Sequence, residues 1–171
     1  MSRSFRKTLA RFVRTAACQV RIDTAFSAVI EACSAMPRQG QAGTWIVPAM
    51  IDAYRTWHSA GRVHSFETWV DGQLVGGLYG VSLGRMFFGE SMFSLRPDAS
   101  KIALAALVCF CREHEVPTID CQQRTEHLIS LGAREVQRSE FEHVLAAGLN
   151  RPTIAEWTYH PNHWRHLSNL I

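Results

Sequence analysis

The sequence lacks the features that mark several classes of protein. Nowhere does it run apolar for the roughly 20 residues that a membrane-spanning helix needs, and its start lacks the apolar core and small-residue cleavage site of a secretion signal. Its five cysteines are odd in number and no two are spaced Cys-x-x-Cys, so neither a disulfide framework nor a zinc knuckle is predicted. We expect a reduced protein of the cytoplasm with no metal centre.

Acidic residues are missing from the beginning of the chain, where six basic residues precede the first acid, Asp23. If residues 3–14 are helical, a basic stripe forms on one face while Phe5, Leu9 and Phe12 face the core. The stripe consists of Arg3, Lys7, Arg11 and Arg14. Such a face suits a phosphate backbone or another anionic surface, although a helix face in contact with solvent has the same pattern.

The length and composition fit one domain. The 171 residues are 47% hydrophobic and 19% charged, with a net charge of +3, as is ordinary for a globular protein with a substantial core. No repeat, low-complexity tract or clear linker divides the chain. We therefore expect a single, monomeric domain over residues 1–171, with an irregular tail from about residue 150.

The spacing of apolar residues predicts a sheet between helices. Helices are expected over residues 24–36, 48–61, 98–114, 124–132 and 139–149. Strands are expected over residues 63–70, 74–84, 85–94 and 118–121. Tight turns join the first three strands into an antiparallel meander, and Asp98 is placed to cap the long helix that follows. The class is α+β, with a mostly antiparallel central sheet flanked by helices.

This order of elements resembles the acetyltransferase superfamily called GNAT, in which a central strand leads through a loop into a long helix. Its members carry a glycine-rich loop there, which binds the pyrophosphate of coenzyme A. Here the connection reads LRPDASK, residues 95–101, and contains no glycine. An acyl-CoA-dependent N-acetyltransferase is therefore kept only as an alternative.

Specific strings give a closer resemblance. In order along the chain stand GTWI, GRVHSFETW, LVGGLYGV, FGESMFS, ASK, IDCQ and HLISLGA. In this order and at nearly this spacing they resemble the leucyl/phenylalanyl-tRNA–protein transferases, over residues 1 to about 145. The resemblance implies transfer of leucine or phenylalanine, and of methionine, from aminoacyl-tRNA to the N-terminal amine of proteins that begin with arginine or lysine. This transfer marks those proteins for degradation by the N-end rule, and it requires no cofactor.

The family carries a further small N-terminal domain, and this chain begins where the second, GNAT-like domain begins. The resemblance therefore implies a GNAT-like aminoacyltransferase domain without its N-terminal neighbour. Two alternatives stay open beside an active transferase. One is a remnant that binds tRNA but has lost turnover, and the other is a transferase with a changed acceptor.

The resemblance assigns catalysis to Asp120 and Gln122. At positions i and i+2 of a strand their side chains point to the same face, and a carboxylate beside an amide can hold an amine and pass on its proton. The ordinary alternative is that Asp120 pairs with Arg124 or caps the next helix.

Glu90 is implied to face the same cleft, where it either holds the amino group of the donor or the acceptor or takes the proton. A charge among aromatic residues needs a partner or a function, because an unpaired buried carboxylate is costly. The alternative is an internal ion pair with Arg85, Arg96 or Lys101.

The resemblance also implies a dry pocket for the side chain of the donor amino acid. Its lining would be Leu78, Phe87, Met92, Leu107 and Ile119, and Trp45 would stack on the terminal adenine of the tRNA. Each of the apolar residues, taken singly, also fits an ordinary core position.

Overall fold

One five-stranded sheet organises the protein. The computed structural model describes residues 2–36 and 44–167. The strand order is β1-β2-β3-β4-β5, with antiparallel pairing throughout except between β4 and β5, which are parallel. The strands are β1 Cys18–Ile22, β2 Val63–Val70, β3 Gln73–Leu83, β4 Met86–Ser94 and β5 Thr118–Asp120. The predicted α+β class and mostly antiparallel sheet are confirmed.

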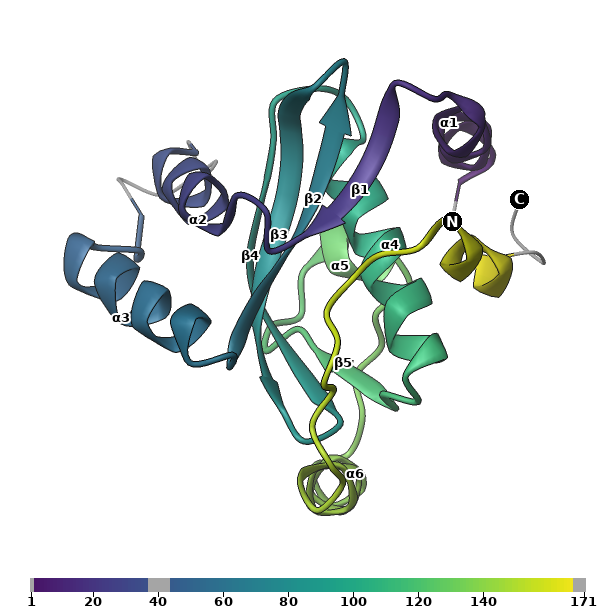
Figure 1. Ribbon diagram of the computed structural model, residues 1–171. Helices are drawn as coiled ribbons and strands as arrows, with labels where there is room; N and C mark the ends of the chain where they lie inside the picture. Colours follow the sequence, from purple (N-terminus) through teal and green to yellow (C-terminus); the bar gives the residue numbers. More distant parts are fainter. Residues whose placement is uncertain (1, 37–43, 168–171) are drawn as a thin grey trace.

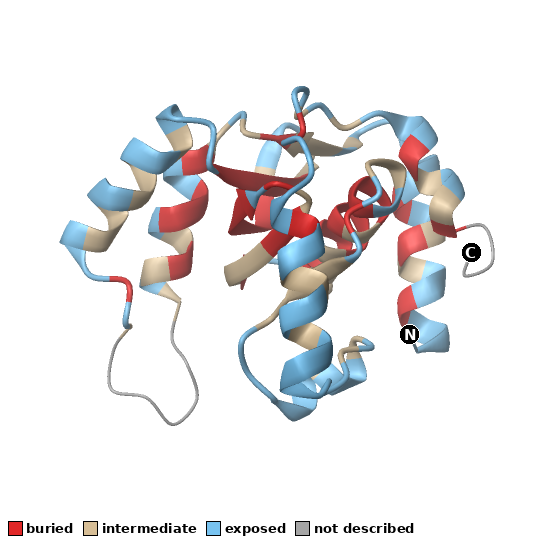
Figure 2. Cartoon of the chain, turned by 90° about the horizontal axis from the view of Figure 1, so that it is seen from below, coloured by how far each residue is buried: buried red, intermediate tan, exposed pale blue. Residues whose placement is uncertain are grey.

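Helices cover both faces of the sheet (Figure 1). They are α1 Arg3–Arg14, α2 Phe26–Ala35, α3 Pro48–Ser59, α4 Ala99–Glu113, α5 Glu126–Ser130 and α6 Arg138–Leu149, followed by the 3-10 helix η1 Pro161–Leu167. Helices α2 and α3 lie on one face, while α4 packs on the other. Viewed from below, the buried residues gather on the sheet and on the helix faces turned toward it (Figure 2). Among the described residues, no helix is long and apolar enough to cross a membrane.

Strand β1 is absent from the sequence prediction. It pairs antiparallel with β2, Cys18 opposite Val70 and Ile22 opposite Phe66. Only Ile22 of its five residues is buried, because β1 lies at the edge of the sheet. Its sequence, CQVRI, alternates apolar and polar residues, which is the pattern of a half-buried strand, so the sequence analysis missed a strand that this pattern indicates.

A β-bulge inserts Glu90 into β4. On β3, Tyr79 lies opposite Ser91 and Gly80 lies opposite Gly89, which leaves Glu90 as the extra residue without a partner on β3. The sequence prediction of an uninterrupted strand over residues 85–94 did not include this insertion.

The bulge changes which side chains of β4 face which helix. Phe87 and Met92 are five residues apart, so in a regular strand they would point to opposite faces. Both nevertheless pack in the core beneath α4, while Phe88 and Phe93 both pack in the core beneath α2. Because Glu90 is an extra residue, the side chains after it change faces, and apolar side chains continue to enter both cores beyond position 90.

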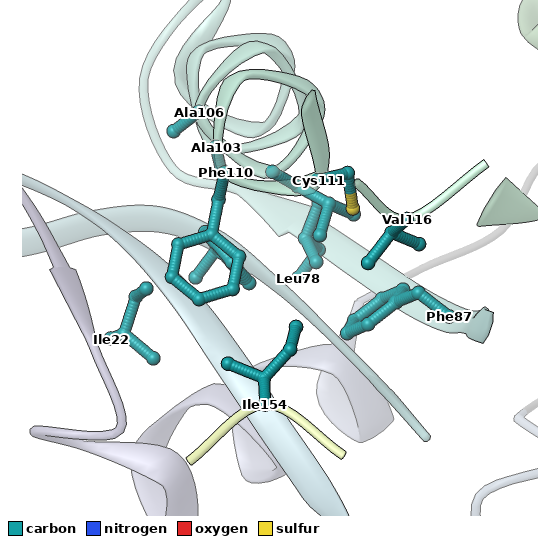
Figure 3. Packing of buried hydrophobic residues seen from close by; sticks show 11 residues of the cluster. Ile22, Leu78, Phe87, Ala103, Ala106, Phe110, Cys111, Val116 and Ile154 are labelled. Carbon is teal, nitrogen blue, oxygen red and sulfur yellow. The ribbon is translucent and has the colours of Figure 1, made fainter. Parts of the chain in front are cut away.

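The core beneath α4 is closed by the segment that follows α6. Ile154 is buried in this core, among Leu78, Phe87 and Phe110 (Figure 3). Trp157 from the same segment stacks on the His64 ring, with centroids 3.5 Å apart and planes 5° apart. The C-terminal segment is therefore part of the apolar core rather than an appendage to it.

Glu67 is a fully buried carboxylate that fixes α2 to the sheet. It accepts hydrogen bonds from the Thr24 hydroxyl, the Ala25 backbone N–H (2.7 Å), the Ser65 hydroxyl (2.9 Å) and the Trp69 indole N–H (3.0 Å). Several hydrogen bonds to one carboxylate offset its loss of hydration. Glu67 is thus committed to structure and is not a candidate for catalysis.

Asp98 departs from its expected role as a helix cap. It precedes α4 as the N-cap residue, but its side chain makes no capping hydrogen bond. Its backbone is left-handed (φ 65°), and its carboxylate instead contacts the Lys101 ammonium at 2.7 Å. The predicted cap is wrong in this respect, since the carboxylate bonds to Lys101 rather than to a backbone N–H of the first turn.

Close packing at the bulge predicts that Gly80→Ala destabilises the protein. A Cβ atom at Gly80 would lie 2.3 Å from the Phe88 carbonyl oxygen and 2.4 Å from the Phe87 ring. We expect a loss of about 2 kcal/mol in the free energy of unfolding, measured by urea denaturation. Gly89→Ala is the matched control, because its Cβ would meet its nearest neighbour, the Asp120 carbonyl oxygen, at 3.7 Å. Equal urea concentrations at the midpoint of unfolding for the two variants would contradict the crowding at Gly80.

Candidate active site

Three polar side chains meet where β4 and β5 separate. The Gln122 side-chain N–H donates to Glu90 Oε1 at 3.3 Å, and the Gln122 backbone N–H donates to Asp120 Oδ1 at 2.8 Å. Phe88 is the register partner of Asp120, so Asp120 lies two positions before Glu90 along the shared edge. The structure thus brings together all three residues to which the sequence analysis gave a catalytic role.

The geometry of Gln122 differs from the prediction. Strand β5 ends at Asp120, and Gln122 has a left-handed backbone (φ 61°). The prediction that Asp120 and Gln122 share one strand face is therefore wrong. The chain turns after Asp120, because its carboxylate accepts the Gln122 N–H, and this turn lets the Gln122 amide reach Glu90.

Tyr54 on α3 is a fourth member of the cluster that the sequence analysis missed. Its hydroxyl lies close enough to the Glu90 carboxylate for the two groups to interact. Burial, and after it the negative charge of Glu90, raises the pKa of Tyr54. Tyr54 therefore faces Glu90 as a neutral phenol. No signal in the sequence identifies it, since a tyrosine on an amphipathic helix is typical of a core residue.

Two of the three expected ordinary partners of Glu90, Lys101 and Arg85, are engaged elsewhere. The Lys101 ammonium contacts Asp98, and the Arg85 guanidinium donates to the His114 carbonyl oxygen at 2.6 Å. Across residues 2–36 and 44–167, Glu90 forms no ion pair. Its charge faces Tyr54 and Gln122 rather than a cation.

The ordinary alternatives for Asp120 are not observed either. Arg124 pairs with Glu135 at 3.0 Å and with Glu126 at 3.8 Å. The side chain that caps α5 is Thr125, which accepts the Leu128 N–H. Asp120 uses one oxygen for the turn at Gln122, and its other oxygen has no hydrogen-bond partner in the described part of the chain.

The arrangement can hold a cation and accept a proton. Glu90 and Asp120 are both partly exposed, and Gln122 between them is exposed. Two carboxylates on either side of one amide create a negative site, which attracts an ammonium group. The amide supplies both a donor and an acceptor for a polar substrate.

The expected pocket residues lie on the opposite face of the sheet from this cluster. Leu78, Phe87 and Leu107 are at most 3% exposed and form packed core beneath α4. Met92 and Ile119 are half-buried at the margin of the same core. Of the five, only these two therefore lie close to a surface that a substrate can reach.

Beyond the end of β5, the α3 and α4 faces of the sheet border one gap. Strand β5 pairs with β4 only as far as Phe88, so the rest of β4, including Glu90 and Met92, has no partner on that side among the described strands. Residues from both faces of β4 therefore border the same gap in the hydrogen-bonded sheet. Met92 approaches this gap from the α4 face and Glu90 approaches it from the α3 face.

Trp45 lies in the loop just before α3, the helix that carries Tyr54, and is 38% exposed. An exposed indole in this position is accessible for stacking. The first residue of the GTWI string, Gly43, lies outside the described residues.

The basic helix is present as predicted. Residues 3–14 form α1, which buries Phe5, Leu9 and Phe12. The basic face is exposed and makes no ion pair with any described residue; it comprises Arg3, Lys7, Arg11 and Arg14. Figure 1 shows α1 beside β1, at the other edge of the sheet from β5.

Two further ligand types find no matching site. At the start of α4, where a pyrophosphate would bind the backbone N–H groups, the Asp98 carboxylate is paired with Lys101. The connection into α4, residues 95–101, also contains no glycine, which argues against a pyrophosphate loop for coenzyme A. In the described segments, no group of three or more His, Cys, Asp or Glu side chains is arranged to hold a metal ion.

The sequence of this chain is similar to one family of known proteins. The model of a family described as leucyl/phenylalanyl-tRNA protein transferase matches residues 2–146. A curated relative named leucyl/phenylalanyl-tRNA–protein transferase, from Methylibium petroleiphilum, is 62% identical over 98% of this chain and 63% of the relative. Its namesake from Leptothrix cholodnii is 58% identical over 99% of this chain and 66% of the relative. The chain thus spans slightly less than two thirds of the length of these relatives.

Among solved structures, an aminoglycoside N-acetyltransferase in complex with CoA has a TM-score of 0.48 and 18% sequence identity, covering 73% of this chain and 93% of that one. This similarity is too distant to support an inference about function.

The contact between Tyr54 and Glu90 predicts a measurable change in the phenol. With fluorotyrosine at position 54, Glu90→Gln should lower the pKa of the ring hydroxyl, because the neighbouring negative charge is removed. Fluorine NMR during a pH titration measures this pKa. The matched control is Asp52→Asn on the same helix, at a 77% exposed side chain that forms a surface ion pair, which should leave it nearly unchanged. An unchanged pKa in both variants would mean that Glu90 and Tyr54 are not in contact.

Proposed function

The chain belongs to the leucyl/phenylalanyl-tRNA protein transferase family, and on this premise we propose that it is a tRNA-dependent aminoacyltransferase. It moves leucine, phenylalanine or methionine from aminoacyl-tRNA to the N-terminal amine of proteins that begin with arginine or lysine. The product is thereby marked for degradation. The reaction takes place in the cytoplasm, on a monomer, without a cofactor.

The observation that supports this proposal is the hydrogen-bonded cluster of Glu90, Gln122 and Asp120. Transfer from an aminoacyl ester requires an uncharged attacking amine, stabilisation of the oxyanion and a proton for the leaving ribose hydroxyl. A carboxylate oxygen without a partner, an amide and a second carboxylate are the groups that such a step uses.

Each residue of the cluster has a distinct role in the proposed step. The free oxygen of Asp120 accepts a proton from the acceptor ammonium, which leaves the amine able to attack the ester carbonyl carbon. The amine adds to the ester carbonyl carbon and forms the C–N bond of a tetrahedral oxyanion. When this intermediate collapses, the bond from carbon to ribose oxygen breaks and the nitrogen loses its second proton; one of the two protons passes to the ribose oxygen and the other is released to solvent. Gln122 donates to the developing oxyanion through its amide N–H. Glu90, oriented by Tyr54, holds the cationic group.

The donor binds across the gap at the end of β5. Met92 and Ile119, which are half-buried beside it, contact the apolar side chain of the donor amino acid. The packed residues Leu78, Phe87 and Leu107 form the floor beneath them. Trp45 stacks on the terminal adenine, and the basic face of α1 binds phosphates without reading bases.

Asp120→Asn is predicted to abolish most of the transfer. The variant keeps the shape of the side chain but removes the proton acceptor, so we expect the rate of leucine transfer from leucyl-tRNA to an arginine-initiated peptide to fall by about 100-fold or more. Transfer is measured with labelled leucine in the absence of coenzyme A. Asp52→Asn, an exposed site on α3, is the control with the same chemical change.

Two results would contradict this assignment. Full activity in Asp120→Asn would exclude Asp120 as the proton acceptor. Wild-type protein that binds tRNA but transfers nothing would instead identify a tRNA-binding remnant.

The basic face of α1 predicts salt-dependent tRNA binding. Replacing Arg3, Lys7, Arg11 and Arg14 by glutamine should weaken tRNA binding and reduce the slope of log affinity against log salt by about 0.7 to 0.9 for each phosphate that is no longer neutralised. The control variant replaces four arginines that already pair with acids: Arg124, Arg134, Arg138 and Arg151. It changes the net charge equally, so an equal loss of affinity would show that only the total charge matters.

A further inference from the structure

The outer edge of β5 is open beside the candidate active site. Strand β5 is the last strand of the sheet, and no backbone hydrogen bond joins residues 118–120 to another described segment on that side. Alternate residues of an edge strand direct their N–H and C=O groups outward, where they can pair with an added chain. This open edge ends at Asp120.

A cavity of about 250 Å³ borders the same edge. Pro117 and Thr118 line it on the side of β5. Arg134 and Val136, from the irregular segment between α5 and α6, line it together with Glu140, Phe141 and Val144 of α6. A space of this size next to the strand accommodates one apolar side chain.

Helix α6 has an apolar face that is only partly covered. Phe141, Val144, Leu145 and Gly148 follow the i, i+3, i+4, i+7 spacing of an amphipathic helix. Only Gly148 is buried, whereas the three larger residues are intermediate in exposure. In Figure 1, α6 lies at the end of the sheet where β5 begins. The cavity therefore separates an open strand edge from apolar side chains that have little else to contact.

We infer that this edge binds the first residues of the acceptor protein as an added antiparallel strand, which rests on the transfer function proposed above. The acceptor amine must lie at Asp120, the C-terminal end of β5, so the rest of the acceptor runs back along β5. Successive residues of a strand advance about 3.4 Å. The third acceptor residue then lies opposite Thr118, and the next one enters the cavity beside Phe141.

Backbone pairing suits an enzyme that must accept many different proteins. Hydrogen bonds to N–H and C=O groups hold a chain in place without reading its side chains. A particular amino acid is then required only at the first position of the acceptor, near the carboxylates of Glu90 and Asp120. The apolar lining around Phe141 adds a preference for an apolar residue at the third or fourth acceptor position.

The first test compares two acceptors on the same variant. Arginine amide occupies the site at Asp120 but is too short to reach the cavity, whereas a peptide that begins Arg-Ala-Leu-Leu reaches it. Phe141→Ala should lower kcat/KM for the peptide by about tenfold and change that for arginine amide by less than about twofold. Leu149→Ala, a 44% exposed leucine on α6 that does not line the cavity, is the control.

The second test leaves the protein unchanged and alters the peptide. A single backbone N-methyl group removes one N–H donor, so methylation along the first four residues should reduce kcat/KM at alternate positions by about tenfold. Methylation far downstream should have no effect. This alternation is the signature of a strand, and it does not depend on whether a variant folds.

The outcomes separate the two proposals. If arginine amide and the peptide are both acceptors but respond equally to Phe141→Ala, or if N-methylation has no periodic effect, the strand-addition inference is overturned and the transfer function stands. If the wild-type chain transfers to neither acceptor, the proposed function fails and the inference fails with it.

Discussion

The extra residue in β4 is the constraint on which both the core and the site depend. Without it, Phe87 and Met92 would point to opposite faces of the sheet, and one of the two cores would lose an apolar layer beyond position 90. Because of it, Glu90 is released from the pairing with β3 and turns toward α3, where it lies near the Tyr54 hydroxyl. The same irregularity therefore preserves packing and places a carboxylate where chemistry is possible.

The early end of β5 has an equally direct consequence. After Asp120 the chain turns back on the Asp120 carboxylate, so β4 continues without a neighbour and both of its faces border one gap. Polar side chains come to this gap from the α3 side and apolar ones from the α4 side. The end of the strand thus forms one gap that is bordered by both polar and apolar side chains.

The sequence predicts the regular parts of this architecture because regular elements have a period. The meander, α4 and the basic α1 all follow from the spacing of apolar residues. Strand β1 alternates apolar and polar residues and was overlooked, whereas the bulge at Glu90 depends on tertiary packing that no local pattern encodes. Gln122 was assigned to a strand, whereas its left-handed backbone is set by the Asp120 carboxylate. Tyr54 approaches the site from α3, far from it in the sequence, so only the fold shows its role.

An open strand edge normally invites aggregation, and the form of β5 limits this hazard. The strand is three residues long and follows Pro117, which cannot donate a backbone hydrogen bond. The flanking Arg134 and Glu140 keep the entrance to the cavity charged. An extended partner therefore gains only a few backbone hydrogen bonds from this edge. In the acceptor complex proposed above, such weak, sequence-independent pairing next to Glu90 and Asp120 selects a chain terminus over an internal segment.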